Sequence, residues 1–200
     1  ASRLFERSPR GGFIPVIDEE RRLVNLMHIF GFQKEDFTTL KISGKDRFSI
    51  KELGRVLVVG GAGYLGSVLV RRLLKKGYKV RILDLFLFGQ ESIKDIANHP
   101  HLEIIHGDMR NISTVSNALK GTDAVIHLAA LVGDPACKSY PLDTIETNYL
   151  ATRALAEACK YYQINRFIFA SSCSVYGKSD GILTEDSPVL PLSLYARSKI

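Results

Sequence analysis

The sequence predicts an α/β fold in which helices cover both faces of a doubly wound parallel sheet. From residue 54 onward, short apolar runs typical of strands alternate with longer amphipathic patterns typical of helices. The runs at 56–59 (VLVV) and 167–170 (FIFA) are apolar throughout, as expected for strands covered on both faces. The glycine-rich segment 60–66 follows the first run directly, where a strand would turn into a helix.

The expected elements follow from these patterns. Each strand is a short apolar run, and each helix has apolar residues three and four positions apart. The expected strands are 55–59, 79–85, 102–106, 124–130 and 166–171, and the expected helices are 64–76, 112–119 and 142–162. Ligands of such sheets bind beyond the carboxyl ends of the strands, so candidate residues are sought there.

Residues 1–53 form an N-terminal extension of unknown role, separate from a nucleotide-binding domain over 54–200. Within the extension we expect a helix over 18–30, a short strand over 38–42 and a helical turn over 50–53. The helix would be capped by Asp18, stopped by Gly31, and apolar along one face at Leu23, Leu26, Met27 and Phe30. The extension carries no chemical motif, so packing or partner contact is its expected role.

The segment 60–66 (GGAGYLG) predicts a turn that binds a dinucleotide. Glycine allows a tight turn at position 60, close approach of a phosphate at 63, and close helix packing at 66. The backbone N–H groups where the helix begins would face a pyrophosphate. The cofactor-binding candidates here are Gly60, Gly63, Tyr64, Leu65 and Gly66. A tight strand-to-helix turn that binds nothing is the alternative.

Asp84 closes the second expected strand, about 20 residues beyond the glycines. An acid at this place accepts hydrogen bonds from the adenosine ribose and repels a 2′-phosphate. Residues 85–88 (LFLF) supply no arginine to neutralise such a phosphate. NAD is therefore favoured over NADP, and a solvated strand end is the alternative reading of Asp84.

Composition excludes several classes of protein. The 200 residues are 46% hydrophobic, enough for a substantial core, and the net charge is +6. The basic residues are scattered, which argues against nucleic-acid binding and favours an anionic cofactor and substrate. The sequence has no apolar run of about 18 residues that would span a membrane. Its three cysteines, Cys137, Cys159 and Cys173, have no zinc-ligand spacing and form no closed disulfide set, so a cytoplasmic location is expected.

A second chemical signal is Tyr195 followed by Lys199, which on a helix would lie one turn apart on the same face. The ammonium would stabilise a phenolate, the form that acts as a general base. The segment 170–177 (ASSCSVYG) supplies hydroxyls at the end of the last strand, and Ser172 is the candidate that orients a substrate hydroxyl. Ordinary surface residues on a helix, and serines that serve local turns, are the alternatives.

These motifs resemble the extended short-chain dehydrogenase/reductase family, particularly its nucleotide-sugar epimerases and dehydratases. The resemblance covers residues 55–200, about three quarters of the chain. The matching segments, in the family's order and spacing, are 60–66, Asp84, 106–110 (HGDMR), 127–130 (HLAA), 148–152 (NYLAT), 170–177, Tyr195 and Lys199.

The resemblance implies a role for each matching residue. Asp108 and Met109 would border the adenine, and Asn148 would support the network on the nicotinamide side. Tyr195 would take the proton from a sugar hydroxyl, commonly at C4, and Lys199 would hold the nicotinamide ribose. The remaining assignments are Leu128, Ala129 and Ala130, which would line the cofactor, and Ser172 as the catalytic serine. A nucleotide-sugar substrate, NAD and a homodimer are also implied, and no metal.

Within the family, 4,6-dehydratases carry an Asp-Glu pair directly after the catalytic threonine, whereas Cys173 and Ser174 follow Ser172 here. This difference favours an epimerase, and Cys173 is expected to be a packed thiol. A dehydratase, an NADP-dependent reductase and a non-catalytic NAD-sensing or scaffolding module are the alternatives. His127 is expected to fill a strand position. Because the sequence ends at Ile200, where a long helix should begin, the domain is expected to be truncated and the chain weakly active or inactive.

Overall fold

The computed structural model describes residues 13–17, 23–28 and 54–200. The chain divides into two compact units, Ala1–Glu52 and Leu53–Ile200. In the first unit, β1 (Phe13–Ile17) and β2 (Leu23–His28) form an antiparallel hairpin. The register pairs Phe13 with His28 and is interrupted by an irregularity between Val16 and Ile17.

The hairpin shows that the helix expected over 18–30 is wrong, because residues 23–28 form a strand. An isolated helix of about a dozen residues is only marginally stable in water. The segment 13–17 (FIPVI) instead provides residues 23–28 with a strand to pair with. Strand formation here depends on that pairing, which helical periodicity does not report. The expected cap, Asp18, and the expected elements over 38–42 and 50–53 lie outside the described residues.

The second unit contains a parallel sheet of five strands. These are β3 (Arg55–Val59), β4 (Lys79–Asp84), β5 (Leu102–His106), β6 (Ala124–His127) and β7 (Arg166–Phe169). Their order across the sheet is β5-β4-β3-β6-β7, and every neighbouring pair is parallel. This is the strand order of the Rossmann fold, so the predicted fold class is confirmed.

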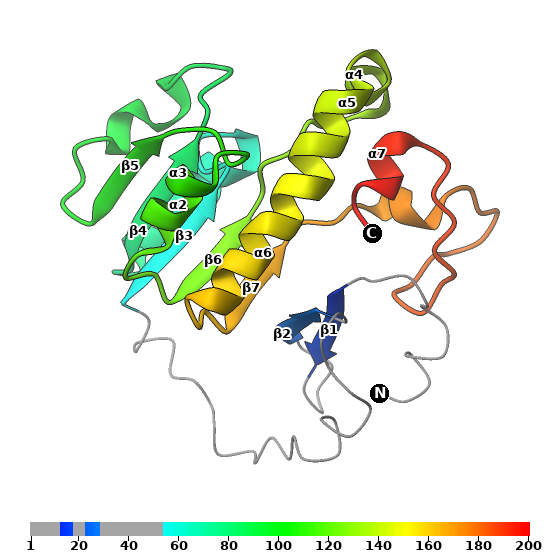
Figure 1. Cartoon of the computed structure of the whole chain (residues 1–200), viewed down its shortest axis with the longest axis horizontal. Coiled ribbons are helices and arrows are strands. Elements are labelled where there is room, and N and C mark those ends of the chain that lie inside the picture. The colour runs from blue at the N-terminus through cyan, green and yellow to red at the C-terminus, as the bar shows by residue number, and fades with distance from the viewer. Residues whose placement is uncertain (1–12, 18–22, 29–53) are drawn as a thin grey trace. The chain divides into compact units, whose positions relative to one another are not determined.

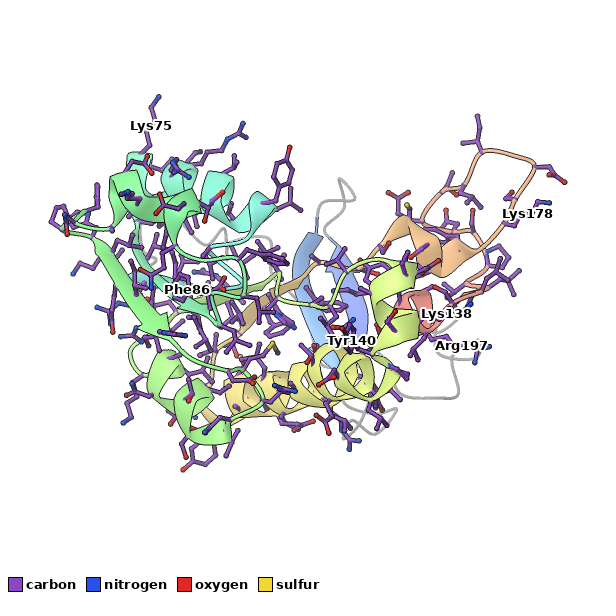
Figure 2. All side chains as sticks on the ribbon, turned by 90° about the horizontal axis from the view of Figure 1, so that it is seen from above. Lys75, Phe86, Lys138, Tyr140, Lys178 and Arg197 are labelled. Atoms are coloured by element: carbon purple, nitrogen blue, oxygen red, sulfur yellow. The ribbon has the colours of Figure 1, made fainter. Side chains whose placement is uncertain are left out.

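Helices cover both faces of this sheet. Figure 2 shows α2 (Tyr64–Lys75) and the 3₁₀ helix η3 (Glu91–Ile96) on one side, and α3 (Ile112–Leu119) and α6 (Ala151–Tyr161) on the other. The shorter helices are α4 (Asp134–Ser139), α5 (Pro141–Thr144), the π-helical η4 (Ile145–Leu150), the 3₁₀ helix η5 (Cys173–Tyr176) and α7 (Leu194–Arg197). The helix expected over 142–162 is therefore a succession of α5, η4 and α6, which Figure 1 shows as one rod.

The core lies against the central strands. Leu57, Val58 and Ile82 have no exposed surface, which confirms that the run over 56–59 is covered on both faces. The same expectation fails for β7, where Ile168 is 48% exposed. β7 pairs only with β6 and forms one edge of the sheet among the described strands, and its apolar pattern is not matched by burial on both faces. No helix in the described part of the chain is long and apolar enough to cross a membrane.

Candidate cofactor-binding and catalytic site

The turn between β3 and α2 is built so tightly that two of its positions admit only glycine. Gly60 has a φ of +83°, and a Cβ there would lie 2.6 Å from the Ala129 nitrogen. A Cβ on Gly66 would overlap the Gly60 carbonyl oxygen. Gly61 is constrained as well, because its Cβ would lie 2.7 Å from Ile82 Cγ1. The sequence pattern had not identified this packing role for Gly61.

The N-terminus of α2 remains available to a ligand. Its N-cap, Gly63, makes no side-chain capping bond, and the first N–H groups of a helix have no partner within the helix. Tyr64 and Leu65 are 90% and 65% exposed. The nearest atom to a Cβ on Gly63 would be the Gly60 oxygen at 3.3 Å. This cradle of free donors at a positive helix end fits a dinucleotide diphosphate.

Asp84, at the end of β4, lies beside this turn. Its Oδ2 accepts a hydrogen bond from the Ala62 N–H at 2.9 Å, and its Oδ1 accepts from the Phe86 N–H at 2.8 Å. The carboxylate therefore holds the turn itself, a role that sequence reasoning missed. Each carboxylate oxygen has a second lone pair, so these bonds are compatible with an additional bond from a ribose hydroxyl.

The loop after β5 carries Asp108 and Met109, the residues expected near an adenine. Met109 is buried. The Arg110 side chain donates to Asp108 Oδ2 from Nε at 2.9 Å and from Nη2 at 2.7 Å, and these bonds hold the pKa of Asp108 below its ordinary value. Arg110 also reaches Asp143 and Glu146 at 3.3 and 3.4 Å. The loop after β5 is thereby joined to α5 and η4.

The segment after β6 lies against the turn. The N–H groups of Leu128 and Ala129 both donate to the Val59 carbonyl, at 2.8 and 3.0 Å, and Ala130 follows them. His127 occupies a strand position, as expected, and is fully buried with its Nε2 2.8 Å from Thr152 Oγ1. Burial, assisted by the charge of Lys199, lowers the pKa of His127 to about 3.

Asn148 joins three segments of the site. Its Oδ1 accepts from the Leu131 N–H at 2.8 Å, and its Nδ2 donates to the Leu131 carbonyl at 2.9 Å and to Ser198 Oγ at 3.1 Å. The side chain is buried and lies in the π-helical η4. Such segments occur frequently at functional sites. The structure therefore places Asn148 as a clamp between the loop after β6 and the end of α7.

The serine loop, residues 170–177, lies next to α7, which contacts η5. Ser172 caps η5 by accepting from the Ser174 N–H at 3.2 Å, and its Oγ is 2.8 Å from Ser174 Oγ. Ser171 Oγ donates to the Lys199 carbonyl at 2.6 Å. Ser172 and Tyr195 are both half-buried. The described contacts bring the serine loop and the segment 195–199 together.

In this structure α7 ends at Arg197, and Lys199 follows its C-cap, Ser198. Lys199 is 4% exposed, its Nζ donates to the Ala170 carbonyl at 3.1 Å, and it lies 4.9 Å from the centroid of the Phe169 ring. Burial lowers its pKa to about 8. The shared helix face of Tyr195 and Lys199 stays a prediction, and the described side-chain contacts of Lys199 are with Ala170 and Phe169.

The cysteines divide by exposure. Cys137 and Cys159 are buried, and burial raises the pKa of the Cys159 thiol to about 12. Cys173 is exposed, so the expectation of a packed thiol is wrong. Cys173 starts the short η5, whose buried residue is Val175. Among residues 13–17, 23–28 and 54–200, no three His, Cys, Asp or Glu side chains are grouped so that they could hold a metal ion.

Comparison with known proteins agrees with this geometry. The NAD dependent epimerase/dehydratase family matches residues 56–200. A UDP-glucose 4-epimerase of Lactobacillus helveticus is 34% identical over 149 residues, 73% of this chain and 44% of the relative. A dTDP-glucose 4,6-dehydratase of Streptomyces niveus is 31% identical over 154 residues, 72% of this chain and 46% of the relative.

A solved UDP-glucose 4-epimerase from Thermus thermophilus, in complex with NAD, has a TM-score of 0.66 at 32% identity and covers 72% of this chain and 47% of that structure. The chain thus spans about half the length of the relatives it matches. The family assignment confirms that NAD is the cofactor of the family and that its members are enzymes. With the Rossmann sheet and the glycine turn, these matches show that the chain belongs to the NAD dependent epimerase/dehydratase family.

Proposed function

We propose that this chain binds NAD at the turn between β3 and α2 and supplies the catalytic side chains of a nucleotide-sugar epimerase or a closely related sugar oxidoreductase. The observation that carries the proposal is the turn itself. Its glycines are required by close backbone contacts at Gly60 and Gly66, and the α2 N-terminus has no side-chain cap. Tyr64 and Leu65 at that end are exposed, so a diphosphate can reach their N–H groups.

Asp84 supports the choice of NAD over NADP. Its carboxylate is held at the mouth of the turn by the N–H groups of Ala62 and Phe86. A 2′-phosphate there would meet a fixed negative charge, whereas a ribose hydroxyl would meet an acceptor. Asp108, Met109 and residues 128–130 would complete the adenosine-side wall.

Bound NAD supplies the acceptor for a hydride from the oxidised sugar carbon. The chain's own residues would move the proton. Tyr195, as a phenolate, would take it from the sugar hydroxyl, becoming a neutral phenol, and would later return it, while Ser172 would orient that hydroxyl. Lys199 would hold the nicotinamide ribose, which requires its ammonium to exchange the Ala170 carbonyl for a ribose oxygen. Asn148 would keep the loop at Leu131 in place.

An epimerase is favoured over a dehydratase by the residues after Ser172. Elimination of water needs an acid and a base beside the sugar, and the positions that would supply them carry Cys173 and Ser174. Ser174 Oγ is already engaged with Ser172 Oγ at 2.8 Å. The substrate class that fits the proposal is a UDP- or dTDP-linked hexose, as named for the relatives above.

The chain is also proposed to form a homodimer, a state in keeping with an uncovered apolar row along α5 and η4. Leu142 is 75% exposed, Ile145 is 39% exposed and Tyr149 is 50% exposed. Residues three, four and seven positions apart on a helical rod share one side. A cytoplasmic location and a separate role for residues 1–53 complete the proposal.

The test has two stages. First, calorimetric titration of the 200-residue chain with NAD and with NADP is expected to show saturable binding that favours NAD. Second, in a whole protein that carries this chain, UDP-glucose is expected to convert to its C4 epimer, and Tyr195→Phe is expected to reduce turnover at least about 100-fold. Ser113→Ala, on the exposed start of α3, serves as the control. Normal turnover by Tyr195→Phe would contradict the catalytic assignment.

A further inference from the structure

Ala62, at the centre of the glycine turn, has both of its backbone polar groups held by side chains. Its N–H donates to Asp84 Oδ2 at 2.9 Å, and its carbonyl accepts from Ser92 Oγ at 2.5 Å. Ala62 itself is 9% exposed. The two peptide planes that meet at Ala62 are therefore fixed independently, one from the end of β4 and one from η3.

The bond from Ser92 bears on the α2 N-terminus. The Ala62 carbonyl shares its peptide plane with the Gly63 N–H, and the two groups point in opposite directions. Holding the carbonyl therefore sets the direction of the N–H at the N-cap of α2. This N–H also closes the turn by donating to the Gly60 carbonyl at 3.3 Å. A change at Ser92 is thus transmitted to the backbone that would receive a diphosphate.

Ser92 is itself held in place by α2. Arg71 donates to the Ser92 carbonyl from Nη2 and to the Ser67 carbonyl from Nη1, both at 2.8 Å. The same guanidinium forms an ion pair with Asp95, also on η3. The next residue, Ile93, is 1% exposed and belongs to the core that contains Val70 of α2. These contacts anchor η3 beside the turn through both polar and apolar groups.

We propose that Ser92 is a positioning residue that pre-organises the glycine turn for the diphosphate of NAD. The inference rests on the proposed NAD site and adds a residue from η3 that bonds to the turn at Ala62. Ser92 acts on the ligand through the Ala62 peptide. If the turn kept the same conformation without the Ser92 hydroxyl, Ser92 would have no effect on the binding of NAD.

The experiment measures NAD and ADP-ribose binding by calorimetry on the 200-residue chain and on three variants, together with the melting temperatures of the ligand-free proteins. Ser92→Ala is expected to weaken both ligands about fivefold, the equivalent of roughly one hydrogen bond of lost pre-organisation. Ser92→Thr keeps the hydroxyl and is expected to restore binding to within about twofold. Ser113→Ala, an exposed serine at the start of α3, is the matched control and is expected to bind as the wild type does.

The outcomes separate the inference from the proposed function. If the wild-type chain binds neither ligand, the proposed NAD site is wrong. If the wild type binds and Ser92→Ala binds equally well, the positioning role is overturned while the NAD site stands. The role is also overturned if Ser92→Ala lowers affinity only in step with a fall in melting temperature and Ser92→Thr restores neither. Weaker binding with an unchanged melting temperature, restored by threonine, supports it.

Discussion

Replacement of Asp84 by alanine should loosen the glycine turn and change the cofactor preference. The wild-type carboxylate accepts from two backbone N–H groups, those of Ala62 at 2.9 Å and Phe86 at 2.8 Å. Ala62 is 9% exposed, so its N–H would be left without an acceptor and with little access to water. The Phe86 N–H lies in a half-buried loop, where water can replace the lost bond more easily.

The magnitude follows from these two environments. A buried N–H left unsatisfied costs about 1–3 kcal/mol, and a bond that water can replace costs about 0.5–1 kcal/mol. Asp84→Ala is therefore expected to lower the free energy of unfolding by about 2–3 kcal/mol. Asp84→Asn keeps one acceptor oxygen for two N–H groups, so about half of that loss is expected.

The assay is urea unfolding of each variant, followed by calorimetric titration with NAD and with NADP. Asp123→Ala is the matched control, because Asp123 accepts a backbone bond from Arg55 at the opposite, exposed end of β3. The control should cost less than about 1 kcal/mol and leave the NAD affinity unchanged. Asp84→Ala should bind NAD more weakly and narrow the preference over NADP. If Asp84→Ala unfolds within about 0.5 kcal/mol of the wild type, the carboxylate does not hold the turn, and the reasoning is refuted.

Three further predictions concern stability. His127 has a pKa of about 3 in the folded chain against an ordinary 6.5, so the unfolded chain binds more protons below pH 6.5. The free energy of unfolding therefore falls by up to about 1.4 kcal/mol per pH unit as acid is added. His127→Gln should remove this part of the pH dependence in urea unfolding at pH 5–7, and equal slopes for variant and wild type would contradict the prediction. Lys199 has a pKa of about 8 in the folded chain against an ordinary 10.5, so the free energy of unfolding should rise with pH between these values. Lys199→Met should flatten that rise and increase the free energy of unfolding at pH 7 by up to about 3 kcal/mol. Superimposable pH profiles of variant and wild type would contradict the prediction. Gly66→Ala should lower the free energy of unfolding by about 3 kcal/mol, because the new Cβ would overlap the Gly60 carbonyl oxygen. Gly181→Ala, whose Cβ would meet no close contact, should lower it by less than about 0.5 kcal/mol. Similar melting temperatures of the two variants would contradict the prediction.

The sheet could be predicted because its signals are local. The strands over 55–106 are short apolar runs, the first and third followed by helical patterns over 64–76 and 112–119, and the structure has β3, β4 and β5 within one residue of the expected ends. The turn over 60–66 could be predicted from glycines that a tight backbone requires. Such signals need no knowledge of distant partners.

Two of the errors concern contacts between segments that are distant in the sequence. Residues 23–28 form a strand because they pair with 13–17, and Ile168, on the edge strand β7, is half exposed where the sequence pattern predicted a covered face. The helix α4 over 134–139, unannounced by periodicity, begins after Gly133 at a φ of +89°. Periodicity within a segment carries no record of what lies beside that segment.

The candidate site shows the same division. The sequence identified Asp84 and Asn148 from their positions, but their partners, Ala62 for the first and Leu131 and Ser198 for the second, lie 17 to 50 residues away. The placement of Lys199 against Ala170 and Phe169 likewise comes from tertiary packing. The sequence can therefore indicate which side chains belong to the site, whereas the backbone atoms to which they hydrogen-bond are known only from the structure.

The most direct test of a dinucleotide site at the β3–α2 turn is a titration of the isotopically labelled 200-residue chain with NAD, followed through its amide NMR signals. Saturable shifts are expected that are largest for residues 63–66 and 84–86, with smaller changes at residues 128–130. Signals at the turn that stay unmoved at saturating NAD, or shifts confined to other parts of the chain, would contradict a dinucleotide site at this turn.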